Sequence, residues 1–130
     1  MLAPMSIKTR PLSPHLQVYR LPMTALMSIT HRITGAILAG GFLLIAGILM
    51  AAAAGASSFN AVMDFAGSPF GTFIIVGWAA ALYYHMLNGI RHLVWDAKPA
   101  TVTKPKAEIS GWIILIATAL LTAGTLFIAL

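Results

Sequence analysis

Two short clusters combine histidine with arginine, and each stands at the end of a long hydrophobic segment. One spans residues 28–32 (SITHR) and the other spans residues 85–92 (HMLNGIRH). Ionisable side chains at the edge of lipid are costly, so they are candidates for function. Three of the four histidines lie in these clusters, and the imidazole is well suited to binding a metal or transferring a proton near neutral pH.

The segments that must position these clusters are membrane-spanning helices. The chain has 130 residues, of which 59% are hydrophobic and 8% are charged, whereas about a quarter of the residues of a soluble domain are charged. A spanning helix needs roughly 20 mostly apolar residues, and the long uncharged runs are residues 33–63, 65–90 and 109–130. We therefore expect an all-α membrane protein with helices at about 23–54, 69–92 and 108–130, preceded by an N-terminal segment, residues 1–22.

The basic residues predict the orientation of these helices. Two groups of four flank the expected spans: Lys8, Arg10, Arg20 and Arg32, then Arg91, Lys98, Lys104 and Lys106. The connection at residues 55–68 is expected to be a loop. It contains no lysine or arginine, and its single charged residue is Asp64. The positive-inside rule places the N-terminus and the second connection on the cytoplasmic or matrix side, and the C-terminus outside. This asymmetry explains the net charge of +5, so no nucleic-acid partner is expected. A cleavable signal peptide is not expected either, because prolines interrupt a basic leader that is too long for one.

This orientation brings both clusters to the same leaflet. Helical spacing gives each cluster a common face, and the predicted stripes are Ser28, His31 and Arg32, then His85, Gly89 and His92, with Tyr84, Asn88 and Arg91 beside them. His85 lies roughly 9 Å deeper than Arg91 along the helix. The spacing therefore predicts one site with two walls.

Each of these residues also has an ordinary structural interpretation. His85 is either a neutral imidazole hydrogen-bonded to a neighbouring helix or an axial ligand to haem iron, which needs a second group to hold its other ring nitrogen. Arg32 and Arg91 are either interfacial anchors or partners of an anionic ligand. Ser28 either bonds to its own backbone or donates to a quinone carbonyl. The chain has no cysteine, so an iron–sulfur cluster held by thiolates would have to lie on another subunit.

The residues that carry these clusters resemble a known family. Residues 10–16 (RPLSPHL) and 28–34 (SITHRIT) are similar to the amino-terminal signature of succinate dehydrogenase cytochrome b556 subunits, and residues 85–96 (HMLNGIRHLVWD) resemble the second signature. The resemblance covers nearly the whole chain. Lys98 departs from the pattern, because the family more often has a small residue there.

The resemblance implies a membrane anchor in an inner membrane, bacterial or mitochondrial, that is part of a heteromeric helix bundle. His85 matches the axial ligand of haem b, which is shared with a second membrane anchor subunit. Ser28 and Arg32 match the ubiquinone site, and His31, Arg91 and His92 fall where the haem propionates are held. The implied partners are the second anchor, an iron–sulfur subunit, a flavoprotein subunit and membrane lipid, and the chain is not catalytic alone. The alternatives are an anchor of fumarate reductase or another respiratory complex, and a small membrane protein without a redox role.

Overall fold

Helices account for most of the structure, a computed structural model that describes residues 20–129. Within these residues the helices are α1 (Met23–Ala54), α2 (Ala56–Gly67), α3 (Pro69–Ala97) and α4 (Lys104–Ala129), with a 3₁₀ turn at Pro99–Thr101. The expected N-terminal segment and the first signature lie mostly outside the described residues.

Three of the helices are long and apolar enough to cross a membrane: α1, α3 and α4. The prediction of an all-α membrane protein with three spanning helices is confirmed. The ends differ in detail, since α3 continues past His92 to Ala97 and α4 begins at Lys104 rather than near residue 108. Proline ends neither helix early, because Pro99 follows α3 and Pro105 lies in the first turn of α4, where its missing N–H costs nothing.

The prediction of a loop at residues 55–68 is wrong, because most of this segment forms helix α2. The polar residues of this segment, among them Asn60 and Asp64, alternate with apolar ones at helical spacing. Gly55 separates α1 from α2 with φ at +111°, a conformation that favours glycine. Ser68 caps α3, because its hydroxyl oxygen accepts a hydrogen bond from the Gly71 N–H at 3.1 Å.

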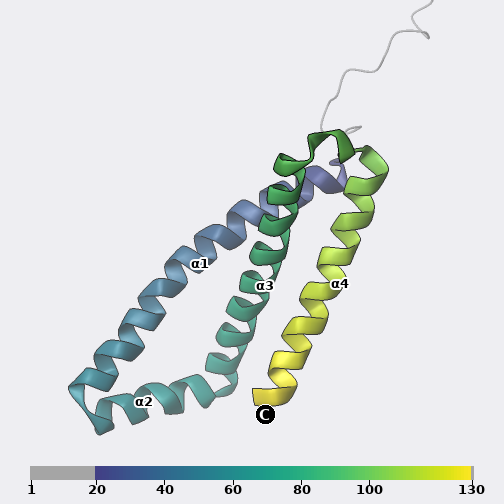
Figure 1. Cartoon of the computed structure of the whole chain (residues 1–130). Helices are drawn as coiled ribbons and strands as arrows, with labels where there is room; N and C mark the ends of the chain where they lie inside the picture. Colours follow the sequence, from purple (N-terminus) through teal and green to yellow (C-terminus); the bar gives the residue numbers. More distant parts are fainter. Residues whose placement is uncertain (1–19, 130) are drawn as a thin grey trace, which may run out of the picture.

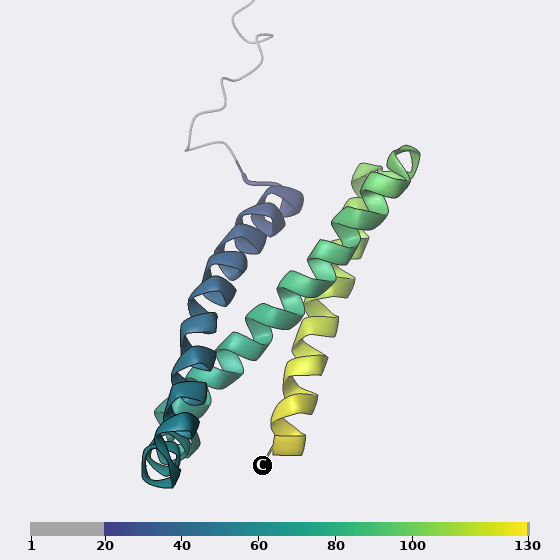
Figure 2. The same ribbon diagram turned by 60° about the vertical axis from the view of Figure 1, so that its left-hand side comes forward.

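The helices form an open frame around α3 (Figure 1). Helix α4 runs beside α3, whereas α1 meets α3 near the N-terminal end of α1 and then leans away from it. The turned view shows α1 and α4 on different sides of α3 (Figure 2). Helix α2 lies crosswise at the far end and joins the ends of α1 and α3. The 32 residues of α1 extend about 48 Å, more than the roughly 30 Å hydrocarbon core, so a tilted α1 still spans it.

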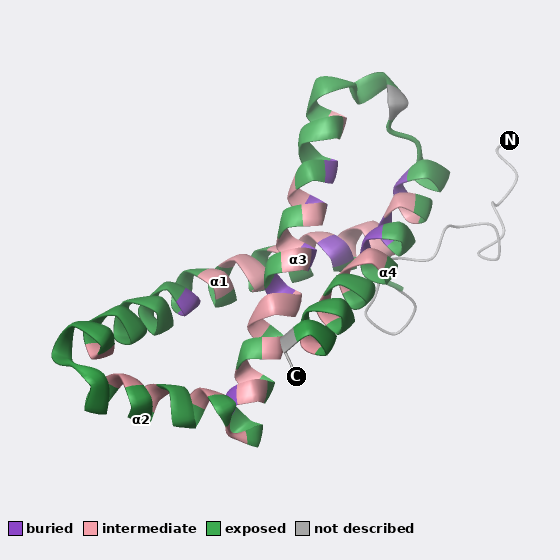
Figure 3. Ribbon diagram, turned by 60° about the horizontal axis from the view of Figure 1, so that its bottom comes forward, coloured by how far each residue is buried: buried purple, intermediate pink, exposed green. Residues whose placement is uncertain are grey.

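Few residues are buried, and several of them gather where α1, α3 and α4 meet (Figure 3). Met27 from α1, Tyr84 from α3 and Ile114 from α4 form the apolar centre of this junction. Asn88 and Arg91 of α3 are buried beside them, at 0% and 7% exposure. Most of the remaining apolar surface is exposed within the chain, as expected where lipid or other subunits cover a protein. The junction therefore positions the polar groups at one end of the frame.

Candidate functional site

The imidazole of His85 is held between α3 and α1. Its Nδ1 lies 3.1 Å from the backbone oxygen of His31 and 3.3 Å from Oγ1 of Thr34. A carbonyl oxygen only accepts hydrogen bonds, so Nδ1 carries the proton and donates it. Neutral His85 therefore has an unprotonated Nε2, and among residues 20–129 no group hydrogen-bonds to this atom.

Thr34 completes the hold on His85, and the sequence prediction missed it. The Thr34 hydroxyl lies 2.9 Å from the carbonyl oxygen of Thr30, to which it donates. Its lone pairs remain to accept from Nδ1 of His85. The signal was available, because Thr34 follows His31 by three residues and so shares its helix face.

His31 forms the opposing wall of the cluster. Its ring stacks on that of His85, with centroids 3.9 Å apart and planes 7° apart. The His92 ring is 5.6 Å from that of His31. The predicted meeting of the two histidine clusters at one end of the molecule is thus observed. The Nδ1 atom of His31 is buried and has no hydrogen-bond partner within residues 20–129.

Two glycines leave different amounts of room beside these rings. A Cβ on Gly35 would lie 3.0 Å from Cε1 of His85. A Cβ on Gly89 would lie 3.8 Å from Cε1 of His31, which is ordinary van der Waals contact. Gly35 is thus the glycine that makes space for His85.

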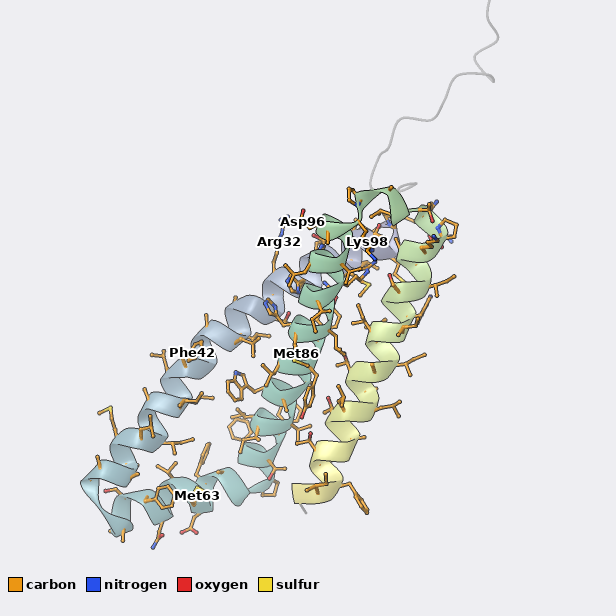
Figure 4. All side chains as sticks on the ribbon, viewed as in Figure 1. Arg32, Phe42, Met63, Met86, Asp96 and Lys98 are labelled. Atoms are coloured by element: carbon orange, nitrogen blue, oxygen red, sulfur yellow. The ribbon has the colours of Figure 1, made fainter. Side chains whose placement is uncertain are left out.

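Ser28 and Arg32 stand on the outer side of this cluster. They lie four residues apart on α1, so they share a face. Ser28 is half-buried and Arg32 is exposed, and Figure 4 shows Arg32 at the end of the frame that also holds Asp96 and Lys98. Arg32 of the predicted quinone-binding pair is therefore accessible to another molecule, whereas Ser28 is partly covered by this chain.

Arg91 takes a different direction from the histidines. It donates from Nε to Oγ of Ser110 at 2.9 Å and from Nη2 to the carbonyl oxygen of Ala107 at 2.7 Å, both on α4. Its Nη1 donates to Oδ1 of Asn88 at 3.1 Å. Its guanidinium carbon also lies 3.9 Å from the centre of the Trp95 ring, a cation–π distance. The structure thus places Arg91 in the α3–α4 contact, with most of its donors in use.

Tyr84 extends the same stripe toward α1, as the spacing with Asn88 and Arg91 predicts. Its hydroxyl donates to the carbonyl oxygen of Met27 at 3.0 Å and lies 2.5 Å from Oγ1 of Thr30. Buried polar groups with such partners hold helices in register. The Tyr84 side of α3 is therefore a packing surface between helices.

The geometry around His85 fits a haem ligand. A haem-ligating histidine binds iron through one ring nitrogen while the other donates to a carbonyl or carboxylate, and His85 has this arrangement. Among residues 20–129 no three His, Cys, Asp or Glu side chains converge to hold a metal ion. A crevice of about 520 Å³ lies between α2, α3 and α4, and none of the predicted site residues lines it.

Comparison with known proteins identifies the family. The family model of the succinate dehydrogenase/fumarate reductase transmembrane subunit matches residues 6–125. The chain belongs to this family. Membership accounts for the three spanning helices, and the match includes both histidine clusters.

Individual relatives within the family carry more specific names. The chain is 49% identical over 88 residues to the succinate dehydrogenase cytochrome b556 subunit of Paracoccus denitrificans, with 68% of each chain covered. It is 34% identical over 113 residues to the cytochrome b556 subunit of Rickettsia felis, with 87% of each covered. It is 38% identical over 119 residues to the mitochondrial cytochrome b560 subunit of Sus scrofa, covering 88% of this chain and 69% of the relative. These relatives favour the succinate dehydrogenase branch over the fumarate reductase and non-redox alternatives.

Proposed function

We propose that this chain is the haem b-binding membrane anchor of succinate dehydrogenase and that it helps to pass electrons from succinate to ubiquinone. Family membership and the cytochrome b names of the relatives support this function. The observation that carries the role of His85 is its Nδ1, which donates to the His31 carbonyl and leaves Nε2 available. Haem b, when bound there, supplies a one-electron carrier within the membrane.

Ser28 and Arg32 are the proposed ubiquinone-binding groups. The Ser28 hydroxyl can donate to one quinone carbonyl, and the Arg32 guanidinium can stabilise the negative charge that develops on the quinone oxygen during reduction. The quinone takes up two electrons and two protons and leaves as quinol. The electrons come from succinate, which is oxidised to fumarate on the partner subunits.

The propionates of the haem are assigned to His31 and His92, which stand beside His85. The resemblance also suggested Arg91, and that assignment stays a prediction. Its existing bonds to Ser110, Ala107 and Asn88 favour a helix-packing role instead.

The proposed assembly contains a second anchor that contributes the opposite haem ligand, together with iron–sulfur and flavoprotein subunits. The exposure of Arg32, with the half-buried Ser28 on the same helix face, supports a quinone site completed by other chains. The charge asymmetry supports an orientation in a bacterial or mitochondrial inner membrane with residues 1–22 and the α3–α4 connection inside and the C-terminus outside.

The absorption spectrum of the purified complex tests the haem assignment. We expect His85→Ala to abolish the b-type band in the reduced-minus-oxidised spectrum, whereas Leu93→Ala, at an exposed apolar position on the same helix, should keep the band. Both variants should retain succinate oxidation by a soluble dye. An unchanged b-type band in an assembled His85→Ala complex would exclude His85 as the iron ligand.

Quinone reduction tests Arg32 separately. Removing a group that stabilises developing oxyanion charge costs roughly 100-fold in rate, so Arg32→Ala should lower quinone reduction by about that factor. Arg32→Lys should recover part of the rate because it keeps the charge. Dye reduction by succinate should stay unchanged, and normal quinone turnover in Arg32→Ala would remove Arg32 from the quinone site.

A further inference from the structure

Helix α2 has three distinct faces. Phe59, Val62 and Ala66 are half-buried and point toward the rest of the chain. The polar residues Asn60 and Asp64 are exposed. They are four residues apart, so they share a face of the helix, and this face differs from the one that carries Phe59, Val62 and Ala66. Met63 and Phe65 flank these faces, at 47% and 56% exposure. The helix therefore has an inner apolar face, an outer polar face and apolar flanks.

The corners of the frame hold α2 across the ends of two spanning helices (Figure 1). At one corner Gly55 makes a turn with positive φ directly after α1. At the other, the Ser68 hydroxyl donates to the carbonyl oxygen of Phe65 at 2.6 Å, and Thr72 donates to the carbonyl oxygen of Ala66 at 3.4 Å. A Cβ on Gly71 would collide with the backbone at Phe65 and Ala66. The α2–α3 corner thus has a fixed, closely packed geometry.

This placement sets the depth of α2 in the membrane. It connects α1 and α3 at the end opposite the histidine cluster, and Figure 4 shows Met63 at that far end from Arg32. Both connected helices are membrane spans, so their ends lie at the boundary between hydrocarbon and headgroups. Exposed phenylalanines continue the apolar flank onto α3, at Phe70 (64%) and Phe73 (74%), and the rings of Phe65 and Phe70 are 6.3 Å apart.

We infer that α2 is an interfacial helix that lies in the plane of the membrane and binds the lipid surface of the leaflet opposite the histidine site. Its Phe65 flank, continued by Phe70 and Phe73, inserts at the headgroup boundary, and Asn60 and Asp64 face water. The helix connects the end of α1 to the start of α3, so its length sets how far apart these two ends lie. This inference is independent of the proposed haem and quinone roles, because it depends only on α2 and the ends of the two spans.

Spin labels on the assembled complex test the inference. A nitroxide is attached through a genetically encoded ketone amino acid, which avoids the cysteines of the other subunits, and the complex is reconstituted into phosphatidylcholine vesicles. Labels at Asn60, Asp64, Met63 and Phe65 compare the faces, and a label at Val62 provides the protein-facing control. Collision with oxygen reports lipid exposure, and collision with a water-soluble nickel chelate reports water exposure.

We expect the oxygen-to-nickel collision ratio to be several-fold higher at Phe65 and Met63 than at Asp64 and Asn60, with low collision of both kinds at Val62. Equal nickel access at Phe65 and Asp64 would place α2 in water and overturn the inference. Low access to both reagents at Phe65 and Met63 would also overturn it, because another subunit would then cover the helix. Succinate–quinone turnover of each labelled complex confirms assembly and reports on the proposed function separately.

Discussion

Two faces of α3 meet the neighbouring helices in different ways. On the face that carries Tyr84, Asn88 and Arg91, side chains donate hydrogen bonds to α1 and α4 and are buried at the helix junction. On the face that carries His85 and His92, the rings are more exposed and one nitrogen of His85 is left without a partner among the described residues. On the first face Tyr84 and Arg91 have partners within this chain, although Nδ2 of Asn88 is buried without one among the described residues. On the second face Nε2 of His85 is left over. A single helix thus separates the groups that hold the fold from those available to a ligand.

Arg91→Ala should produce the largest loss of stability on the packing face. It removes bonds from a charged donor to Ser110, Ala107 and Asn88, and leaving such buried partners unpaired costs about 3 kcal/mol. The midpoint of thermal unfolding of the purified complex should fall accordingly.

The variant Arg91→Lys separates packing from a propionate contact. Lysine keeps the charge but cannot reproduce the forked geometry, so a packing role predicts that the thermal midpoint stays low in Arg91→Lys. A normal midpoint combined with a shifted haem potential in both variants would instead assign Arg91 to the cofactor.

Gly35→Ala should produce the next effect, on the histidine face. The added methyl group would lie 3.0 Å from Cε1 of His85, and relieving such overpacking costs about 2 kcal/mol. Because the His85 ring must move, the midpoint potential and absorption maximum of the b haem should shift in a redox titration. An unchanged spectrum and potential would contradict the assignment of His85 as the haem ligand, because the ring would have moved without affecting the haem.

Tyr84→Phe should have a smaller effect, confined to the packing face. The change removes the hydroxyl that donates to the Met27 carbonyl but keeps the ring, so the cost is about 1 kcal/mol. The thermal midpoint should fall modestly while the haem spectrum stays as in the unmodified complex. A spectral change as large as that of Gly35→Ala would contradict the separation of the two faces.

Gly89→Ala should have the smallest effect and serves as the matched control for Gly35. The new methyl group would lie 3.8 Å from His31, and replacing glycine in a helix is itself favourable by about 1 kcal/mol. The haem potential should stay close to that of the unmodified complex, and the thermal midpoint should stay the same or rise slightly. A loss of haem here would show that a bound ligand approaches Gly89 closely.

The amino-acid sequence was sufficient to predict the spanning helices and the meeting of His31 with His85. The long uncharged runs indicate the spanning helices directly, and the spacing of the few polar residues indicates which of them share a helix face. The direction of Arg91 was not predictable, because adjacent residues on a helix point about 100° apart and its partners on α4 depend on how α4 packs against α3. The shared helix face of Thr34 and His31 could be inferred from their spacing, but the hydrogen bond that Nδ1 of His85 donates to Thr34 depends on where α1 crosses α3.

Helix α2 shows a second kind of limit. The segment at residues 55–68 was expected to be a loop between two spans, with Asp64 as its single charged residue. A helix forms there because Phe59, Val62 and Ala66 share one face that packs toward the rest of the chain. The period of the apolar residues was therefore more informative than their number.

The hydrogen bond from His85 to the His31 carbonyl has a consequence for how the subunit matures. In this chain the carbonyl oxygen of His31 accepts from Nδ1 and so orients the ring with Nδ1 as its donor atom. If His85 holds haem as proposed, Nε2 would be the ligand atom, and the fold itself would already have set the orientation of the ring before the cofactor is inserted.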